Sequence, residues 1–140
     1  MSTRSIADEL EIRSLVHRYA DAASRRDPLG VASTFTNHGE WHAPELGRHK
    51  GHDAMVTFFS AMLGGWNVFL QGLQSGVVVL DAADADHAAG RWFVQEVGQR
   101  SEGTNLTIAA FTTTSTGAKP GRGSSTAAGT TRCCEASTAP

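Results

Sequence analysis

The most chemically suggestive residue of the chain is Glu96, a carboxylate inside an apolar run that extends from Ala88 to Val97. This run predicts a long central strand of one curved sheet, because its side chains alternate between two faces that both carry bulky apolar residues. Trp92, Val94 and Glu96 share one of these faces. A carboxylate in apolar surroundings has a raised pKa and can act as a general base. The alternative is a half-buried strand with Glu96 at its solvated end.

Histidines gather between residues 38 and 52 and raise the question of a metal site. His38, Glu40 and His42 alternate along one strand face, and His49 and His52 follow nearby. Imidazole and carboxylate groups are common zinc ligands. The spacing matches no standard zinc pattern, however, and a site on one strand edge and a glycine-rich loop would lack fixed supporting groups. We therefore expect surface histidines and no metal site.

Three helices and a short strand precede the central strand. A helix over residues 5 to 26 is predicted from the three-and-four spacing of its apolar residues. Asp27 as N-cap and Pro28 in the first turn then begin a second short helix. A short strand over residues 40 to 43 and a third helix from Asp53 to about Gly64 follow. The apolar stripe of the first helix comprises Ile12, Leu15, Val16, Tyr19, Ala20 and Ala23.

Beyond residue 66 the pattern changes to strands that are separated by polar turns. The β-rich runs occupy residues 67–70, 76–80, 88–97 and 105–111. Helices followed by a run of meandering strands predict an α+β fold, with the helices against one face of an antiparallel sheet. Residues 1–111 are therefore the predicted domain.

Length and charge exclude several classes of function. At 140 residues, with a formal net charge of -2, the chain predicts one domain and no basic face for nucleic acid. The charged N-terminus lacks the apolar core of a signal peptide, and no run approaches the roughly 20 apolar residues of a membrane span. We therefore expect a cytoplasmic protein without nucleic-acid or membrane partners. Cys133 and Cys134 are adjacent and cannot join distant segments.

A series of short motifs runs in order along the chain: Tyr19-Ala20-Asp21, Arg25-Arg26-Asp27, Thr34-Phe35, Glu40-Trp41, Gly51-His52-Asp53-Ala54-Met55 and Gly90-Arg91-Trp92-Phe93-Val94-Gln95-Glu96. This order resembles the SnoaL-like branch of the nuclear transport factor 2-like superfamily, over residues 6 to 111. The resemblance implies a cone, in which a strongly bent antiparallel sheet wraps around the first helix and encloses an apolar pocket. The superfamily includes polyketide cyclases, dehydratases, isomerases, a dehydrochlorinase and non-catalytic proteins, so the fold alone does not decide the function.

In the lyases that the chain resembles, an acid on the first helix pairs with a histidine on the strand after the third helix. The carboxylate orients the imidazole while the imidazole takes a proton. The resemblance places Tyr19 at the family's tyrosine, Ser24 where the acid usually lies and Leu70 where the histidine is expected. A shift of one turn would make Asp21 the acid, although Asp21 lies off the apolar stripe. The dyad is therefore predicted to be absent, since Gln71 nearby cannot act as a base.

The resemblance implies a protein that binds a small hydrophobic molecule and that, if it is an enzyme, is a lyase or isomerase of the dehydratase or cyclase type. The chemistry expected is proton transfer at a carbon next to a carbonyl, with Tyr19 as hydrogen-bond donor and Glu96 or Asp21 as the base. That reaction needs no metal or organic cofactor. The alternative is a non-catalytic binding or dimerisation module, which the missing dyad favours. The ligand-binding residues implied by the resemblance are Ser24, Trp41, Leu70, Trp92, Val94 and Ala109.

Residues 112–140 consist almost wholly of small and polar residues, which predicts a low-complexity, disordered tail. A SnoaL-like domain would continue past Phe111 and end in a closing strand, which is missing from this pattern. When GC-rich codons are assigned to residues 111–136 and read two bases out of frame, they can encode sequences that resemble that strand. The C-terminus is therefore interpreted as atypical, and either frameshifted or a natural tail. An open sheet edge, together with relatives that pair through their sheet faces, predicts a homodimer.

Overall fold

The computed structural model describes residues 3–43, 46–84, 87–103, 105–116 and 128–137, and it describes side chains only between residues 5 and 103 of these ranges. Along the described chain, two helices are followed by two short strands, a third helix and four longer strands. In that order they are α1 (Thr3–Ser24), α2 (Pro28–Ser33), β1 (Glu40–Ala43), β2 (Gly47–Lys50), α3 (His52–Gly64), β3 (Val68–Leu80), β4 (Ala88–Gln99), β5 (Asn105–Thr116) and β6 (Ala128–Ser137).

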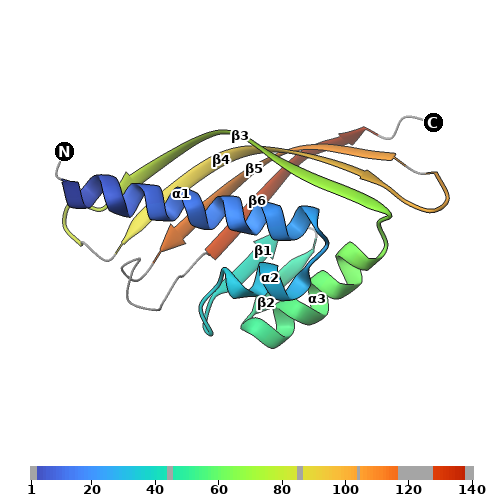
Figure 1. The fold of residues 1–140 in the computed structure, drawn as a ribbon, viewed down its shortest axis with the longest axis horizontal. Helices are drawn as coiled ribbons and strands as arrows, with labels where there is room; N and C mark the ends of the chain where they lie inside the picture. The colour runs from blue at the N-terminus through green and yellow to red at the C-terminus, as the bar shows by residue number, and fades with distance from the viewer. Residues whose placement is uncertain (1–2, 44–45, 85–86, 104, 117–127, 138–140) are drawn as a thin grey trace.

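The strands form one sheet in the order β2-β1-β6-β5-β4-β3. β1 and β6 are parallel, and every other neighbouring pair is antiparallel. The long strands bend over α1, while α2, α3, β1 and β2 gather at one end of the molecule (Figure 1). The predicted α+β fold, with a strongly bent sheet packed around the first helix, is confirmed. None of the helices in the described ranges is long and apolar enough to cross a membrane.

Strand β4 alternates buried and more exposed residues along its length, as predicted. Trp92 and Val94 are buried on the inner face and Glu96 is partly buried there, whereas Phe93 and Val97 are exposed on the outer face. A strand that packs one face on a helix requires this period of two. β4 therefore carries both core side chains and the candidate base on the same inner face.

The turn between α1 and α2 fixes the direction of the helical layer. Arg26 adopts a left-handed backbone conformation, with φ of 56°, directly after α1. Asp27 then caps α2, because its carboxylate accepts a hydrogen bond from the backbone N of Gly30 at 2.9 Å, and Pro28 occupies the first turn. The guanidinium of Arg26 also donates to the carbonyl oxygen of Trp66, which ties this turn to the start of β3.

Trp92 lies flat against the inner face of the sheet. A Cβ added at Gly76 or at Gly90 would overlap its indole ring, so neither position tolerates a side chain without repacking. Ile12 and Val16 of α1 pack into the same cluster. The bare backbone at the two glycines therefore makes room for the indole ring on the face of the sheet that packs on α1.

A second and larger cluster fills the end of the molecule where the helices gather. Its most buried members come from α2 and α3 and include Val31, Met55, Phe59 and Leu63. Helices α2 and α3 pack against each other, and α1 closes the cluster from the side of the sheet. Burying these apolar side chains supplies the main stabilisation of this end.

The structure corrects the predicted strands between residues 67 and 80. The two short runs expected there form one strand, β3, whose register with β4 shifts between Leu73 and Gly76. Such an irregularity accommodates residues that do not fit the ladder. Arg13 of α1 donates from Nη1 to the carbonyl oxygen of Gly76 at 3.2 Å, which supplies a partner at the break. Residues 47–50, expected as loop, form β2.

The C-terminal strands differ from the expectation of a missing closing strand. β5 continues past Phe111 to Thr116, so the predicted boundary at residue 111 lies inside a strand, and β6 lies between β5 and β1. Pairing of backbones needs no large side chains, and the run from Thr112 to Thr114 is β-branched, which favours extended structure. Of the predicted tail, residues 117–127 and 138–140 lie outside the described residues. The frameshift hypothesis stays a prediction.

We expect Gly90→Ala to lower the free energy of unfolding by about 1–3 kcal/mol, the usual cost of adding a methyl group to a filled core. The added Cβ would overlap the ring of Trp92. Urea denaturation followed by circular dichroism measures the change. Gly64→Ala is the matched control, because nothing lies within 4 Å of a Cβ at that position in α3. Equal stability of Gly90→Ala and the wild type would show that Trp92 does not pack on the backbone as described.

Candidate functional site

A hydrogen-bonded row crosses from α1 to β4 on the inner face of the sheet. The backbone N of Gln71 in β3 donates to Oγ of Ser24 at 2.9 Å, and its side-chain Nε2 donates to Oε1 of Glu96 at 2.5 Å. Gln71 and Glu96 are direct partners in the β3–β4 register. All three side chains are partly buried. Three elements far apart in the sequence therefore place one carboxylate among polar partners on an otherwise apolar face.

Tyr19 brings a phenol to the same region from α1. Its hydroxyl oxygen accepts a hydrogen bond from Nε1 of Trp41 at 3.1 Å. The rings of Phe35 and Phe59 lie edge-on to the phenol, with centroids at 6.0 Å and 6.3 Å. Because Trp41 occupies an acceptor position of the hydroxyl, the O–H of Tyr19 remains available as a donor. Aromatic packing fixes the ring that carries this donor.

Burial sets the protonation of both acidic groups. It raises the pKa of Glu96 above its ordinary range, against a smaller opposite effect of the hydrogen bond from Gln71. It also raises the pKa of Tyr19 well above its ordinary value; the negative charge of Glu96 adds to the increase, and the hydrogen bond from Trp41 reduces it. The phenol therefore stays protonated at neutral pH. Tyr19 and Glu96 therefore lie close enough to interact electrostatically.

The remaining predicted site residues fall into two groups. Trp41 is buried beside Tyr19 and belongs to the large core cluster. Trp92 and Val94 belong to the other cluster, where they pack with Ile12 of α1. These two residues are core side chains of the same sheet face that carries Glu96. Ala109 lies in β5 opposite Gln95, and its side chain lies outside the part of the structure that is described.

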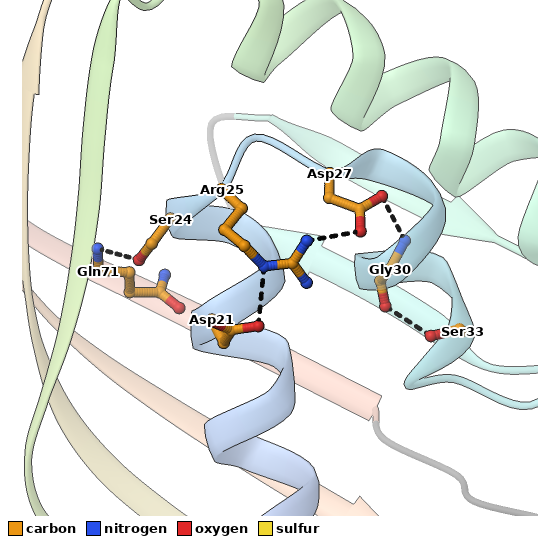
Figure 2. A network of polar contacts seen from close by, with 7 residues as sticks. All are labelled: Asp21, Ser24, Arg25, Asp27, Gly30, Ser33 and Gln71. Atoms are coloured by element: carbon orange, nitrogen blue, oxygen red, sulfur yellow. Dashed lines mark hydrogen bonds and ion pairs between the residues drawn. The ribbon is translucent and has the colours of Figure 1, made fainter.

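Asp21 does not lie with Glu96 and Tyr19. Its carboxylate accepts a hydrogen bond from Nε of Arg25 at 3.0 Å, and its side chain is 65 % exposed. Figure 2 shows the division: Ser24 reaches toward Gln71 on β3, whereas Arg25 bridges Asp21 and Asp27 on another side of the helix. Asp21 lies two residues after Tyr19, and side chains two apart on a helix point in nearly opposite directions. The structure therefore gives no support to Asp21 as an alternative base.

Leu70 also lies on a different face from the one predicted. Its side chain is 57 % exposed on the outer face of β3, while Phe69 and Gln71 on either side point inward. An error of one residue in the phase of a strand moves every side chain to the opposite face. The residue that sequence reasoning undervalued is thus Gln71. The alternation of Phe69, Gln71 and Leu73 signals its inward position, but apolar residues on both faces of β3 obscure that signal.

The histidines take structural positions instead of forming one group. The ring of His49 stacks on that of Phe58, with centroids 3.8 Å apart, and the ring of His52 is hydrogen-bonded to the carbonyl oxygen of Phe35. Glu40 pairs with Arg48 of the neighbouring strand. Within the described residues, no cluster of three or more His, Cys, Asp or Glu side chains could hold a metal ion.

Comparison with known families identifies the fold around this site. The profile of the SnoaL-like domain matches residues 4–122, most of the chain. The chain belongs to the SnoaL-like family. No curated protein shows significant similarity to it. The positions at which the resemblance placed the acid and the histidine hold Ser24 and Leu70, and Oγ of Ser24 accepts a hydrogen bond from the backbone N of Gln71, the residue after Leu70.

Solved structures with a similar fold include proteins described as dehydrochlorinases and as a scytalone dehydratase. A hexachlorocyclohexane dehydrochlorinase, LinA type 2, is 16% identical, with a TM-score of 0.85 over 98% of this chain and 92% of that chain. LinA-type3 from Novosphingobium barchaimii LL02 is 18% identical, with a TM-score of 0.83 over 97% and 92%. A protein assigned as a scytalone dehydratase, from Novosphingobium aromaticivorans, is 14% identical, with a TM-score of 0.83 over 100% and 93%. At these identities the likeness establishes the fold alone.

We expect Glu96→Gln to be more stable than the wild type at neutral pH, and equally stable in acid. The folded state holds the proton of Glu96 to a higher pH than the unfolded state does. The wild type therefore loses stability as pH rises from the ordinary glutamate pKa to the raised one, and the loss is constant above it. Urea denaturation at a series of pH values measures this difference.

Glu102→Gln is the control for this pH series, because Glu102 is exposed. It reports the effect of removing one exposed charge. A difference between Glu96→Gln and the wild type that does not change with pH would contradict the burial of the Glu96 carboxylate on β4.

Proposed function

We propose that this SnoaL-like protein binds a small hydrophobic ring compound with a carbonyl group and transfers a proton at the carbon next to that carbonyl. Glu96 is the base and Tyr19 is the hydrogen-bond donor. The observation that carries the proposal is the pairing of a partly buried carboxylate of raised pKa with a phenol that stays protonated. The predicted cytoplasmic location belongs to the same proposal.

The proton moves in two steps that both use groups of this chain. The carboxylate of Glu96 takes a proton from the ring carbon, and the electron pair of the broken C–H bond forms an enolate. The O–H of Tyr19 donates to the enolate oxygen and stabilises its charge. In an unsaturated ketone the enolate is conjugated, and Glu96 returns the proton to the far carbon of the dienolate, which is an isomerisation. In a ketone with a leaving group on the neighbouring carbon, that group departs with its bonding electrons and Glu96 gives its proton to the group or to water, which is an elimination. No cofactor enters either route.

Trp41 supports the role of Tyr19 in this proposal. Its Nε1–H donates to the phenol oxygen, so the phenol proton can turn only toward another acceptor. The surrounding rings, among them Phe35 and Phe59, restrict access of water to the phenol. A donor held in a partly dry site stabilises a developing charge more strongly than the same donor in water.

The enzyme proposal predicts exchange of the ring protons of 2-tetralone, a cyclic ketone, in D2O. We expect Glu96→Gln to reduce the exchange rate by about 10²–10⁴, the range for loss of a general base. Tyr19→Phe is expected to reduce it by about 10²–10³, the range for loss of one oxyanion donor. Proton NMR of the ketone measures the rate, with the uncatalysed rate subtracted.

Asp21→Asn is the matched control for the exchange experiment, because the structure places Asp21 in an exposed ion pair. Its rate is expected to equal that of the wild type. Full activity of Glu96→Gln would sink the enzyme proposal. Binding of 2-tetralone without exchange would support the second candidate, a non-catalytic binding module.

A specific observation also favours a role in dimerisation. The outer face of β3 and β4 carries exposed apolar side chains, and Leu70 and Val97 are direct neighbours in the register. Soluble monomers rarely leave a large apolar face uncovered. We propose that a second copy of this chain covers it. The exposed apolar residues of this face are Val68, Leu70, Val77, Val79, Phe93 and Val97.

We expect Leu70→Lys to convert the dimer into a monomer, because a charge at the centre of an apolar interface would have to be buried without a partner. Sedimentation velocity measures the mass. Leu10→Lys is the control, since Leu10 is an equally exposed leucine, at 61 %, on α1. A wild type that sediments as a monomer at micromolar concentration would refute this role.

A further inference from the structure

Gln71 links three elements through two different groups. Its backbone N–H is held by Ser24 of α1, and its carboxamide reaches across the β3–β4 pair to Glu96. The backbone bond fixes where β3 lies against the end of α1. The side-chain bond fixes which oxygen of the carboxylate is engaged. One residue therefore connects the position of the helix with the orientation of the candidate base.

The hydrogen bond divides the two oxygens of Glu96 into different roles. Oε1 accepts from Nε2 of Gln71 at 2.5 Å, while Oε2 takes no hydrogen bond from the described residues. An amide donor favours the ionised carboxylate over the protonated acid, since only the former is a strong acceptor at that oxygen. The amide itself does not titrate near neutral pH. The hydrogen-bond partner of Glu96 therefore does not titrate, unlike the histidine of a carboxylate–histidine pair, and Tyr19, which interacts electrostatically with Glu96, stays protonated at neutral pH.

We propose that Gln71, held by Ser24, is a positioning residue that binds Oε1 of Glu96 and leaves Oε2 as the oxygen that takes the proton. The inference rests on the proposed function and extends it to how the base is kept ready. A partly buried carboxylate without such a donor would hold its proton to higher pH, and fewer molecules would carry the active base at neutral pH. Ser24 and Gln71 thus position the base and do not act as bases themselves.

The test compares Gln71→Met with the wild type by carbon-13 NMR of the glutamate side-chain carboxyl carbons, followed over a pH titration. Methionine has nearly the length of glutamine and no donor. We expect the midpoint of the Glu96 signal to move to higher pH in Gln71→Met, and to move in the same direction by less in Ser24→Ala. Gln74→Met is the matched control, because Gln74 is an exposed glutamine of the same strand. An unchanged midpoint in Gln71→Met would overturn the inference.

Activity supplies a second readout that a purely structural role would not move. In Gln71→Met we expect kcat for exchange of 2-tetralone to fall by about tenfold at pH 7, the lower range for a hydrogen bond to a charged group. The loss should disappear as pH rises, because Glu96 is then ionised in both proteins. A loss that is equal at all pH values would show that Gln71 does not affect the protonation of Glu96 and would contradict the inference.

A measurement on the unaltered chain covers the case in which Gln71→Met does not fold. The side-chain amide protons of Gln71 should titrate with the same midpoint as the carboxyl carbon of Glu96, since the hydrogen bond couples them. Amide shifts that stay flat through that titration would overturn the inference. Failure of the proposed function would give a different result. Glu96→Gln would then retain exchange of 2-tetralone, while in the wild type the amide protons of Gln71 would still titrate with the carboxyl carbon of Glu96.

Discussion

The close approach of α1 to the sheet is the constraint on which the other contacts depend. Trp92 spans the bare backbone of Gly76 and Gly90, and the helix rests on the far side of the indole. Two turns after Ile12 along α1, the phenol of Tyr19 interacts electrostatically with Glu96 of β4. Ser24, the last residue of the helix, accepts a hydrogen bond from the backbone of β3. A thicker layer at the glycines would separate the helix from both strands. Helix α1 therefore connects the cluster around Trp92 with the polar contacts of Tyr19 and Ser24.

Strand β4 carries both core side chains and the candidate base, and burial affects the free energy of the two in opposite directions. Trp92 and Val94 gain free energy from burial, whereas Glu96, two residues further on, loses hydration on the same face. The donor from Gln71 offsets part of that loss without removing the rise in pKa. Burial of a carboxylate lowers the stability of the folded state, so the apolar packing around it has to compensate for that cost. Here Val94 lies between Glu96 and Trp92, the most buried aromatic residue among the described side chains of the sheet.

Much of the fold was predictable from the sequence because local signals and tertiary packing agree. The apolar stripe of α1, the cap at Asp27 and the alternation around Glu96 all depend on short-range periodicity, and the structure has all three. The position of Gln71 was not predictable, because β3 has apolar residues on both faces and the pattern leaves its phase undecided. β6 was missed for a different reason: small residues carry no hydrophobic pattern, yet their backbones pair as well as any others.

Strand β6 gives the chain a demanding order of assembly. It lies between β5 and β1, so Trp41 pairs with Gly129 across most of the length of the chain. Contacts between such distant segments form late, since a long loop must close before they contribute. On the ribosome, the helices, β1 and the β3–β5 meander emerge before their shared neighbour exists. During that interval β1 and β5 each present an unpaired edge, so nascent chains on one messenger can pair with one another before each sheet is complete.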